Sequence, residues 1–222
     1  MGDSFLNFAD RTDAGRQLAE RLAALEPENP VIYALPRGGV PVAVVIAERL
    51  RAPLDLVLVR KLGAPQNPEV ALGAIVEGDT PETVLNDDVR RASGADDAYI
   101  ARIRTRELDE LKRRKRMYLG DRPRQDPSGR TVIVVDDGLA TGATMKAALI
   151  ALKRQGAARI IVALPVAQHS ALKDIATQAG TVICLHPAQH FHGVGEFYLD
   201  FHQMTDEETI GLLRQYWARS DV

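Results

Sequence analysis

The 222-residue sequence predicts an α/β fold in which a parallel core sheet is flanked by helices. Two observations lead to this prediction. Short runs of Val, Ile and Leu alternate along the chain with segments whose apolar residues recur at helical spacing. Gly-rich turns join several of these runs to the helix that follows, which is typical of right-handed βαβ units. A chain of this length fits a single domain, residues 1–222, with a sizeable core.

These two patterns also locate the individual elements. Leu18, Leu22 and Leu25 predict a first helix over residues 13–25. Later helices are expected over residues 41–50, 96–118, 143–155 and 169–178, and core strands over residues 31–35, 54–60, 131–136, 159–166 and 181–185. Residues 62–95 place Pro and Gly between short apolar pieces, so we expect a small hairpin with a mobile loop. Thr205 and Glu208 form a capping box that begins a C-terminal helix.

The composition argues against several classes of partner. The formal net charge is -2, so the whole molecule offers no strong field for nucleic acid or an acidic membrane. No apolar run approaches the roughly 18 residues of a membrane span, and we expect a cytoplasmic protein. Residues 102–116 carry eight Lys or Arg among three acids. A solvated helix face, a subunit contact and an RNA-binding surface are the alternative interpretations of this basic segment.

The stretch "VIVVDDGLATGATM", residues 132–145, carries the strongest chemical signal. Asp136 and Asp137 fall at the carboxyl end of a predicted core strand, where open α/β sheets bind their ligands. The small residues that follow lead into a helix whose free N–H groups and positive dipole end favour an anion, most often a phosphate. The expected anion-binding residues are Gly138, Leu139, Ala140, Thr141, Gly142, Ala143 and Thr144.

Two carboxylates would repel a phosphate, so they must address another part of the ligand. Ribose hydroxyls can donate charge-assisted hydrogen bonds to Asp136 and Asp137 while a 5′-phosphate sits in the loop. The pattern therefore predicts a ribose 5-phosphate ligand. The alternative is a strand-turn-helix whose acids merely cap the helix.

This stretch resembles the phosphoribosyl diphosphate (PRPP) binding motif of type I phosphoribosyltransferases: apolar residues, two acids, two variable residues, then Thr-Gly-x-Thr. The resemblance implies the type I phosphoribosyltransferase fold with a small C-terminal hood. It also implies transfer of ribose 5-phosphate between PRPP and a nitrogenous base, with release of pyrophosphate. Mg²⁺ would be held mainly by diphosphate and ribose oxygens, with Asp136 and Asp137 as its protein ligands, directly or through water.

Two further stretches extend the resemblance. "LPRGGVP", residues 35–41, is similar to the family's pyrophosphate loop, which would give Arg37, Gly38 and Gly39 to the diphosphate. Related enzymes place a strained or cis peptide in this loop, which we expect at Arg37–Gly38. Arg60 and Lys61, expected at the end of the next core strand, would also bind the diphosphate. An ordinary turn and solvated charges are the alternatives.

The resemblance also covers the two segments that would enclose the substrate. Residues 62–82 look like the flexible catalytic loop, in which Glu69 and Glu77 are the acids that could transfer a proton. The alternative for both acids is a solvated side chain. Residues 186–204 correspond to the hood over the acceptor base. There Phe191, Val194 and Tyr198 would stack on the base or fill the hood's own core.

The sequence does not name the acceptor base. Hypoxanthine-guanine enzymes have an Asp at the position of Ala140. This chain has Ala there, as adenine-type enzymes do, which argues against a 6-oxopurine as the acceptor base. We expect PRPP and a nucleobase or nucleotide as ligands, a homodimer, and neither a membrane nor a nucleic acid as partner. The alternative function is a PRPP- or nucleotide-binding regulator with the same fold and little turnover. His186, His190 and His192 raise a metal site as a further alternative, but no Cys or acid completes a ligand set.

Overall fold

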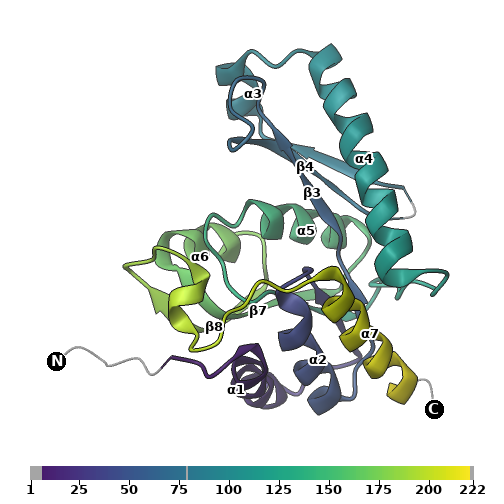
Figure 1. Ribbon diagram of the computed structural model, residues 1–222, viewed down its shortest axis with the longest axis vertical. Coiled ribbons are helices and arrows are strands. Elements are labelled where there is room, and N and C mark those ends of the chain that lie inside the picture. The colour runs from purple at the N-terminus through teal and green to yellow at the C-terminus, as the bar shows by residue number, and fades with distance from the viewer. Residues whose placement is uncertain (1–6, 79, 221–222) are drawn as a thin grey trace.

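The computed structural model describes residues 7–78 and 80–220 and is built around a five-stranded parallel sheet (Figure 1). The strands lie in the order β2-β1-β6-β7-β8. Their bounds are β1 Pro30–Ala34, β2 Leu54–Leu56, β6 Thr131–Val135, β7 Arg159–Gln168 and β8 Thr181–Ala188. The predicted α/β fold with a parallel core sheet is confirmed.

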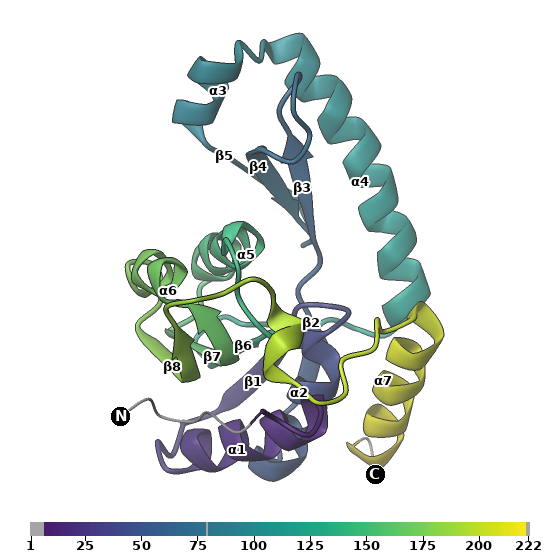
Figure 2. The ribbon, with the colours of Figure 1, turned by 60° about the vertical axis from the view of Figure 1, so that its left-hand side comes forward.

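The core strands are continuous runs of apolar residues because helices cover both faces of the sheet. Ile32 and Ala34 of β1 pack with α1 (Arg11–Ala23), α2 (Gly39–Leu50) and α7 (Asp206–Ser220). Val31 and Tyr33 point to the other face, toward α5 (Ala143–Arg154) and α6 (His169–Ala176). Figures 1 and 2 show these two helical layers on opposite sides of the sheet.

None of the helices within residues 7–78 and 80–220 is long and apolar enough to cross a membrane.

The chain reverses its direction of travel across the sheet between β1 and β6. From β1 it proceeds to β2 on one side, whereas β6, β7 and β8 succeed one another on the other side. Ala34 pairs in register with Val135, and the Leu35 amide donates to the Val135 carbonyl over 2.9 Å. The loops that follow β1 and β6 therefore leave the sheet side by side, at the switch point where such sheets bind ligands.

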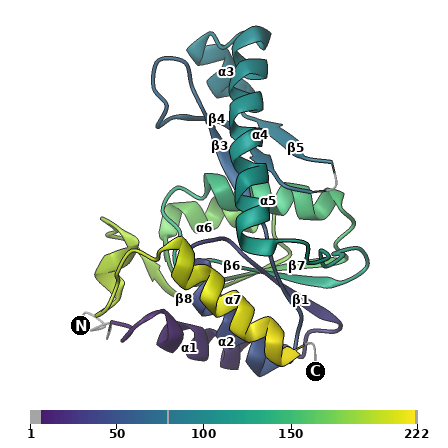
Figure 3. The same ribbon diagram turned by 45° about the vertical axis from the view of Figure 1, so that its right-hand side comes forward.

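A second, antiparallel sheet projects from the core (Figures 2 and 3). It consists of β3 Val59–Gly63, β4 Ala71–Val76 and β5 Glu82–Leu85, followed by α3 Asp87–Ser93 and the long α4 Asp97–Leu119. The expected hairpin is confirmed, with one further strand. The strand expected over residues 54–60 is wrong in extent, because the chain leaves the core sheet after Leu56 and starts β3 at Val59. Val57 and Leu58 between them are buried, so burial continued where strand pairing stopped.

A buried ionic cluster joins the second sheet to the core. Glu77 follows β4, is 4% exposed and contacts Arg124 and Lys115, the latter over 2.6 Å. Arg124 also donates to Asp55 of β2 over 3.3 Å. Glu77 therefore contributes to this junction. Because it is buried, it is not a solvated side chain of the loop.

The C-terminal segment returns to the core as the sequence predicted. The Glu208 amide donates to the Thr205 hydroxyl over 3.1 Å, and the Thr205 amide donates to the Glu208 carboxylate over 2.8 Å, which confirms the capping box. A 3₁₀ turn, η1 Val194–Phe197, lies between β8 and α7 in the expected hood. From α7, the Trp217 indole donates to the Leu54 carbonyl over 2.9 Å and anchors the helix to β2.

Candidate active site

The two acids of the motif lie directly after β6, at the switch point of the sheet. Both side chains are partly buried, and the Asp137 amide donates to Asp136 Oδ1 over 2.9 Å. Burial raises the pKa of both carboxyl groups, and the charge of Asp137 raises the pKa of Asp136 further. Two desolvated carboxylates in contact favour a ligand that brings hydroxyl donors or a cation to them.

The loop after the acids is anchored to β7 and opens toward solvent. The Leu139 amide donates to the Val166 carbonyl over 3.0 Å, and the Gln168 amide donates to the Leu139 carbonyl over 2.9 Å. Gly142 is the N-cap of α5 with φ 73°, a left-handed conformation that favours glycine. Within the described part of the chain no side chain caps this helix, whereas Thr141 and Thr144 are exposed beside its N-terminus. Uncapped N–H groups with flanking hydroxyls are suited to an anion.

The loop after β1 lies against the acids. A Cβ atom placed on Gly38 would lie 2.0 Å from Asp137 Oδ2, and one on Gly39 would lie 2.7 Å from the Val135 carbonyl oxygen. The structure thus brings the Arg37-Gly38-Gly39 stretch and the acid pair together, as the motif positions predicted. The cis peptide lies at Pro36–Arg37, so its expected position at Arg37–Gly38 was wrong by one bond.

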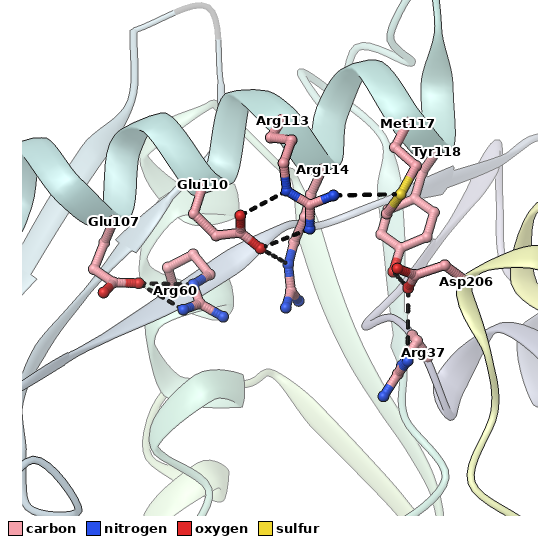
Figure 4. Close-up of polar contacts among 9 residues, drawn as sticks. All are labelled: Arg37, Arg60, Glu107, Glu110, Arg113, Arg114, Met117, Tyr118 and Asp206. Carbon is pink, nitrogen blue, oxygen red and sulfur yellow. Dashed lines mark hydrogen bonds and ion pairs between the residues drawn. The ribbon is translucent and has the colours of Figure 1, made fainter.

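The basic residues expected at the diphosphate are paired with carboxylates, and Figure 4 shows the pairs of Arg37 with Asp206 and of Arg60 with Glu107. Arg37 lies 3.6 Å from Asp206 of α7, and Arg60 donates to Glu107 of α4 over 2.8 and 2.7 Å. Lys61 lies 3.2 Å from Glu69, whose side chain is 90% exposed. These are three separate ion pairs, two of which start from neighbouring residues of β3.

Arg60 and Lys61 are not at the end of a core strand. That expectation was wrong, because both lie on β3 of the second sheet. The chain has left the core sheet before it reaches them.

Part of the basic segment of α4 is paired with acidic side chains. Glu110 accepts hydrogen bonds from Arg113 and Arg114, over 2.7 to 2.9 Å, and Lys115 is paired with the buried Glu77. Figure 4 shows the Glu107 and Glu110 pairs along one face of the helix. These contacts involve part of the segment in the protein's own ion pairs, and the choice among a solvated face, a subunit contact and an RNA-binding surface stays a prediction.

The predicted hood residues pack behind the acids. The Tyr198 hydroxyl donates to the Asp137 carbonyl over 2.6 Å, and its side chain is 5% exposed. Val194 packs closely against Gly138, because a Cβ atom placed on Gly138 would lie 2.5 Å from Val194 Cγ1. Phe191 stacks on Phe197 with the ring centroids 5.7 Å apart. In the structure the three residues pack in the hood's own cluster, and stacking on a base stays a prediction.

Sequence reasoning missed Arg11. This first residue of α1 donates from Nε to Asp137 Oδ2 over 2.8 Å, across 126 residues of sequence. Sequence reasoning also missed Asp206 and Glu107, the acids paired with Arg37 and Arg60. No local signal marks a partner so far along the chain.

Among residues 7–78 and 80–220 no three His, Cys, Asp or Glu side chains form a metal-binding group, and the three His residues of the hood supply none.

Comparison with known proteins agrees with this geometry. The family model for the phosphoribosyl transferase domain matches residues 3–202. The chain belongs to this family. It is 44% identical over 206 residues to two relatives from Mycobacterium tuberculosis strains, named "Putative phosphoribosyl transferase" Rv0571c and MT0597. The match covers 93% of this chain but 46% of theirs, so the chain spans about half the length of these relatives.

A solved structure shows the same fold over nearly the whole phosphoribosyl transferase domain. The crystal structure of TT1426 from Thermus thermophilus superposes with a TM-score of 0.84 and 46% sequence identity. The superposition covers 95% of this chain and 99% of that chain. The second sheet and α4 therefore lie within the region that the two proteins share.

Proposed function

We propose that this chain transfers ribose 5-phosphate between PRPP and a nitrogenous base, with release of pyrophosphate. One observation carries the proposal: three ligand-binding features meet at the switch point of the sheet. They are the Asp136-Asp137 pair, the uncapped N-terminus of α5 and the Gly38-Gly39 backbone packed against the acids. Their chemistry matches ribose, phosphate and diphosphate respectively.

Each feature has a role in the transfer. Asp136 and Asp137 accept hydrogen bonds from the ribose hydroxyls and favour the positive charge that develops at the anomeric carbon. The amides and hydroxyls of residues 138–144 bind the 5′-phosphate. The bond from the anomeric carbon to the diphosphate oxygen breaks, a bond to the base nitrogen forms, and that nitrogen loses its proton.

The diphosphate requires cations, which the chain offers at Arg37, Arg60 and Lys61. All three are paired with carboxylates in the structure, so binding of the diphosphate requires an exchange of partners. Glu69 beside Lys61 is our candidate for the group that accepts the proton of the base, because its carboxylate is open to solvent. We expect Phe191, Val194 and Tyr198 to hold the loop that carries the acids in place by packing against it within the hood.

Mg²⁺ fits this donor set as a companion of the substrate. Magnesium is commonly held by one or two carboxylates together with substrate phosphates and water. Asp136 and Asp137 would supply the carboxylates, and the ion would neutralise charge on the diphosphate. Homodimer formation and a cytoplasmic location stay predictions, the first of which sedimentation velocity measures.

Pyrophosphate release tests the proposal. The protein is incubated with PRPP, Mg²⁺ and each member of a panel of purine and pyrimidine bases, and pyrophosphate is measured by a coupled assay. Release that depends on one class of base confirms the transferase. PRPP binding without release for any base would favour the regulatory alternative, and the absence of both would overturn the proposal.

A further inference from the structure

Arg11 is a buried cation held against one of the two strand-end acids. Its Nε lies 2.8 Å from Asp137 Oδ2, and the two side chains are only 8% and 14% exposed. Asp10, the N-cap of α1, accepts a hydrogen bond from the Asp13 amide and fixes the start of the helix that carries Arg11. A long flexible side chain is thereby delivered to the active site from a rigid element.

The guanidinium is fixed on two further sides. Its Nη1 donates to the His202 carbonyl over 3.0 Å, and its Cζ lies 4.0 Å above the centre of the Phe201 ring. A lysine could keep the charge but could not make both hydrogen bonds and the stacking contact with the same geometry. The arrangement uses the planar shape of arginine as well as its charge.

The Asp137 side chain and main chain are also held in place. Arg11 holds its Oδ2 atom, the Gly38 backbone packs against the same carboxylate, and Tyr198 donates to the Asp137 main-chain carbonyl. Within residues 7–78 and 80–220, Asp136 makes no ion pair, and its Oδ1 accepts a hydrogen bond from the Asp137 amide. The two adjacent acids are thus unequal, since one is clamped by a cation and the other is not.

We propose that Arg11 is a positioning residue, which fixes the Asp137 carboxylate in the orientation that receives a ribose hydroxyl. This inference rests on the proposed function. It adds a residue from outside every motif to the ribose side of the site.

The inference predicts a ligand-selective defect. In Arg11→Met, which keeps an unbranched apolar stem but removes the charge and the donors, the affinity for PRPP and for ribose 5-phosphate falls about tenfold or more, the effect of one lost charge-assisted hydrogen bond between ribose and Asp137. Inorganic pyrophosphate contains no ribose, so its affinity changes less than about threefold. Arg11→Lys recovers part of the lost affinity. Arg16→Met, an exposed change on the same helix, leaves all three affinities as in the wild type.

Calorimetric titrations of the three ligands with Mg²⁺, with thermal melts of each variant, measure these effects. Equal affinities in the wild type and Arg11→Met, or an equal loss for all three ligands, would overturn the inference and leave Arg11 a structural residue. If Arg11→Met does not fold, Arg11→Lys decides, because it must still weaken ribose 5-phosphate more than pyrophosphate. A wild type that binds neither PRPP nor ribose 5-phosphate would instead refute the proposed function.

Discussion

The carboxylate of Asp206 lies 3.6 Å from the guanidinium of Arg37, so the first residue of α7 is paired with the cation of the predicted pyrophosphate loop. The Tyr118 hydroxyl, from the end of α4, donates to the same carboxylate (Figure 4). The side chains of Arg37 and Asp206 are 35% and 33% exposed, so a soluble anion can reach the pair. Under the proposed function, the diphosphate of PRPP competes with Asp206 for Arg37.

Removal of this internal competitor should strengthen pyrophosphate binding. In Asp206→Asn the amide still accepts from Tyr118 but no longer attracts Arg37, and we expect roughly twofold to fivefold tighter binding, the range of a partly exposed ion pair. The helix loses an acid in its first turn, which costs about 0.5–1 kcal/mol of stability. Calorimetry and a thermal melt measure both effects. Glu207→Gln, the exposed neighbour, is the control, and unchanged binding in Asp206→Asn would contradict the competition.

Glu110 should make the stability of the protein depend on acidic pH. Hydrogen bonds from Arg113 and Arg114 lower the pKa of Glu110 from 4.5 to about 2. A lowered folded-state pKa contributes stability that is present above about pH 4.5 and is lost as the pH falls toward 2. Urea unfolding at a series of pH values should show wild type more stable than Glu110→Gln near neutral pH, with the difference shrinking below pH 4.5. A constant difference would contradict this pairing; Asp109→Asn is the exposed control.

Gly38 should tolerate no side chain. A Cβ there would lie 2.0 Å from Asp137 Oδ2, so Gly38→Ala must move either the loop or the acid. We expect a loss of about 1–3 kcal/mol in the free energy of unfolding, as for other overpacked sites, together with weaker PRPP binding. Gly211→Ala in α7, where a Cβ meets nothing within 4 Å, should instead gain about 0.5–1 kcal/mol. Denaturant melts compare the two, and a Gly38→Ala variant as stable as wild type would refute the close packing.

The core of the fold was predictable because its signals are local. The β6 strand and the loop that starts α5 are contiguous in sequence, so apolar residues, acids and glycines could be interpreted together. The division of residues 54–60 into β2 and β3 was not predictable, since Val57 and Leu58 are as apolar and buried as strand residues. No Gly or Pro marks the point where pairing with the core sheet ends.

The composition of the site was predictable, but its electrostatic state was not. The motif positions predicted that the stretch around Arg37 meets Asp137, and the Gly38 backbone packs against that carboxylate. Their partners Arg11 and Asp206 come from helices at opposite ends of the chain, which only the folded structure brings to the motifs. The carboxylates that hold the predicted diphosphate cations therefore emerge from the three-dimensional structure alone.

The choice of variant for the central test follows from these partners. Replacement of Asp137 would leave Arg11 buried without its acid, a change that typically costs about 3–5 kcal/mol and would confuse binding with folding. Asp136 is desolvated and repelled by its neighbour, so Asp136→Asn should keep or slightly raise stability. The amide preserves the shape of the side chain and removes its charge.

Calorimetric titration of PRPP with Mg²⁺ into wild type and Asp136→Asn tests most directly whether the β6 acids form a ribose site. We predict saturable binding to the wild type. In the variant the affinity should fall about tenfold or more, because the bond that a ribose hydroxyl makes to a charged acceptor is worth about 1.5–3 kcal/mol. Its melting temperature should be at least that of wild type. Equal PRPP affinity in the two folded proteins, or no binding to the wild type, would contradict the account.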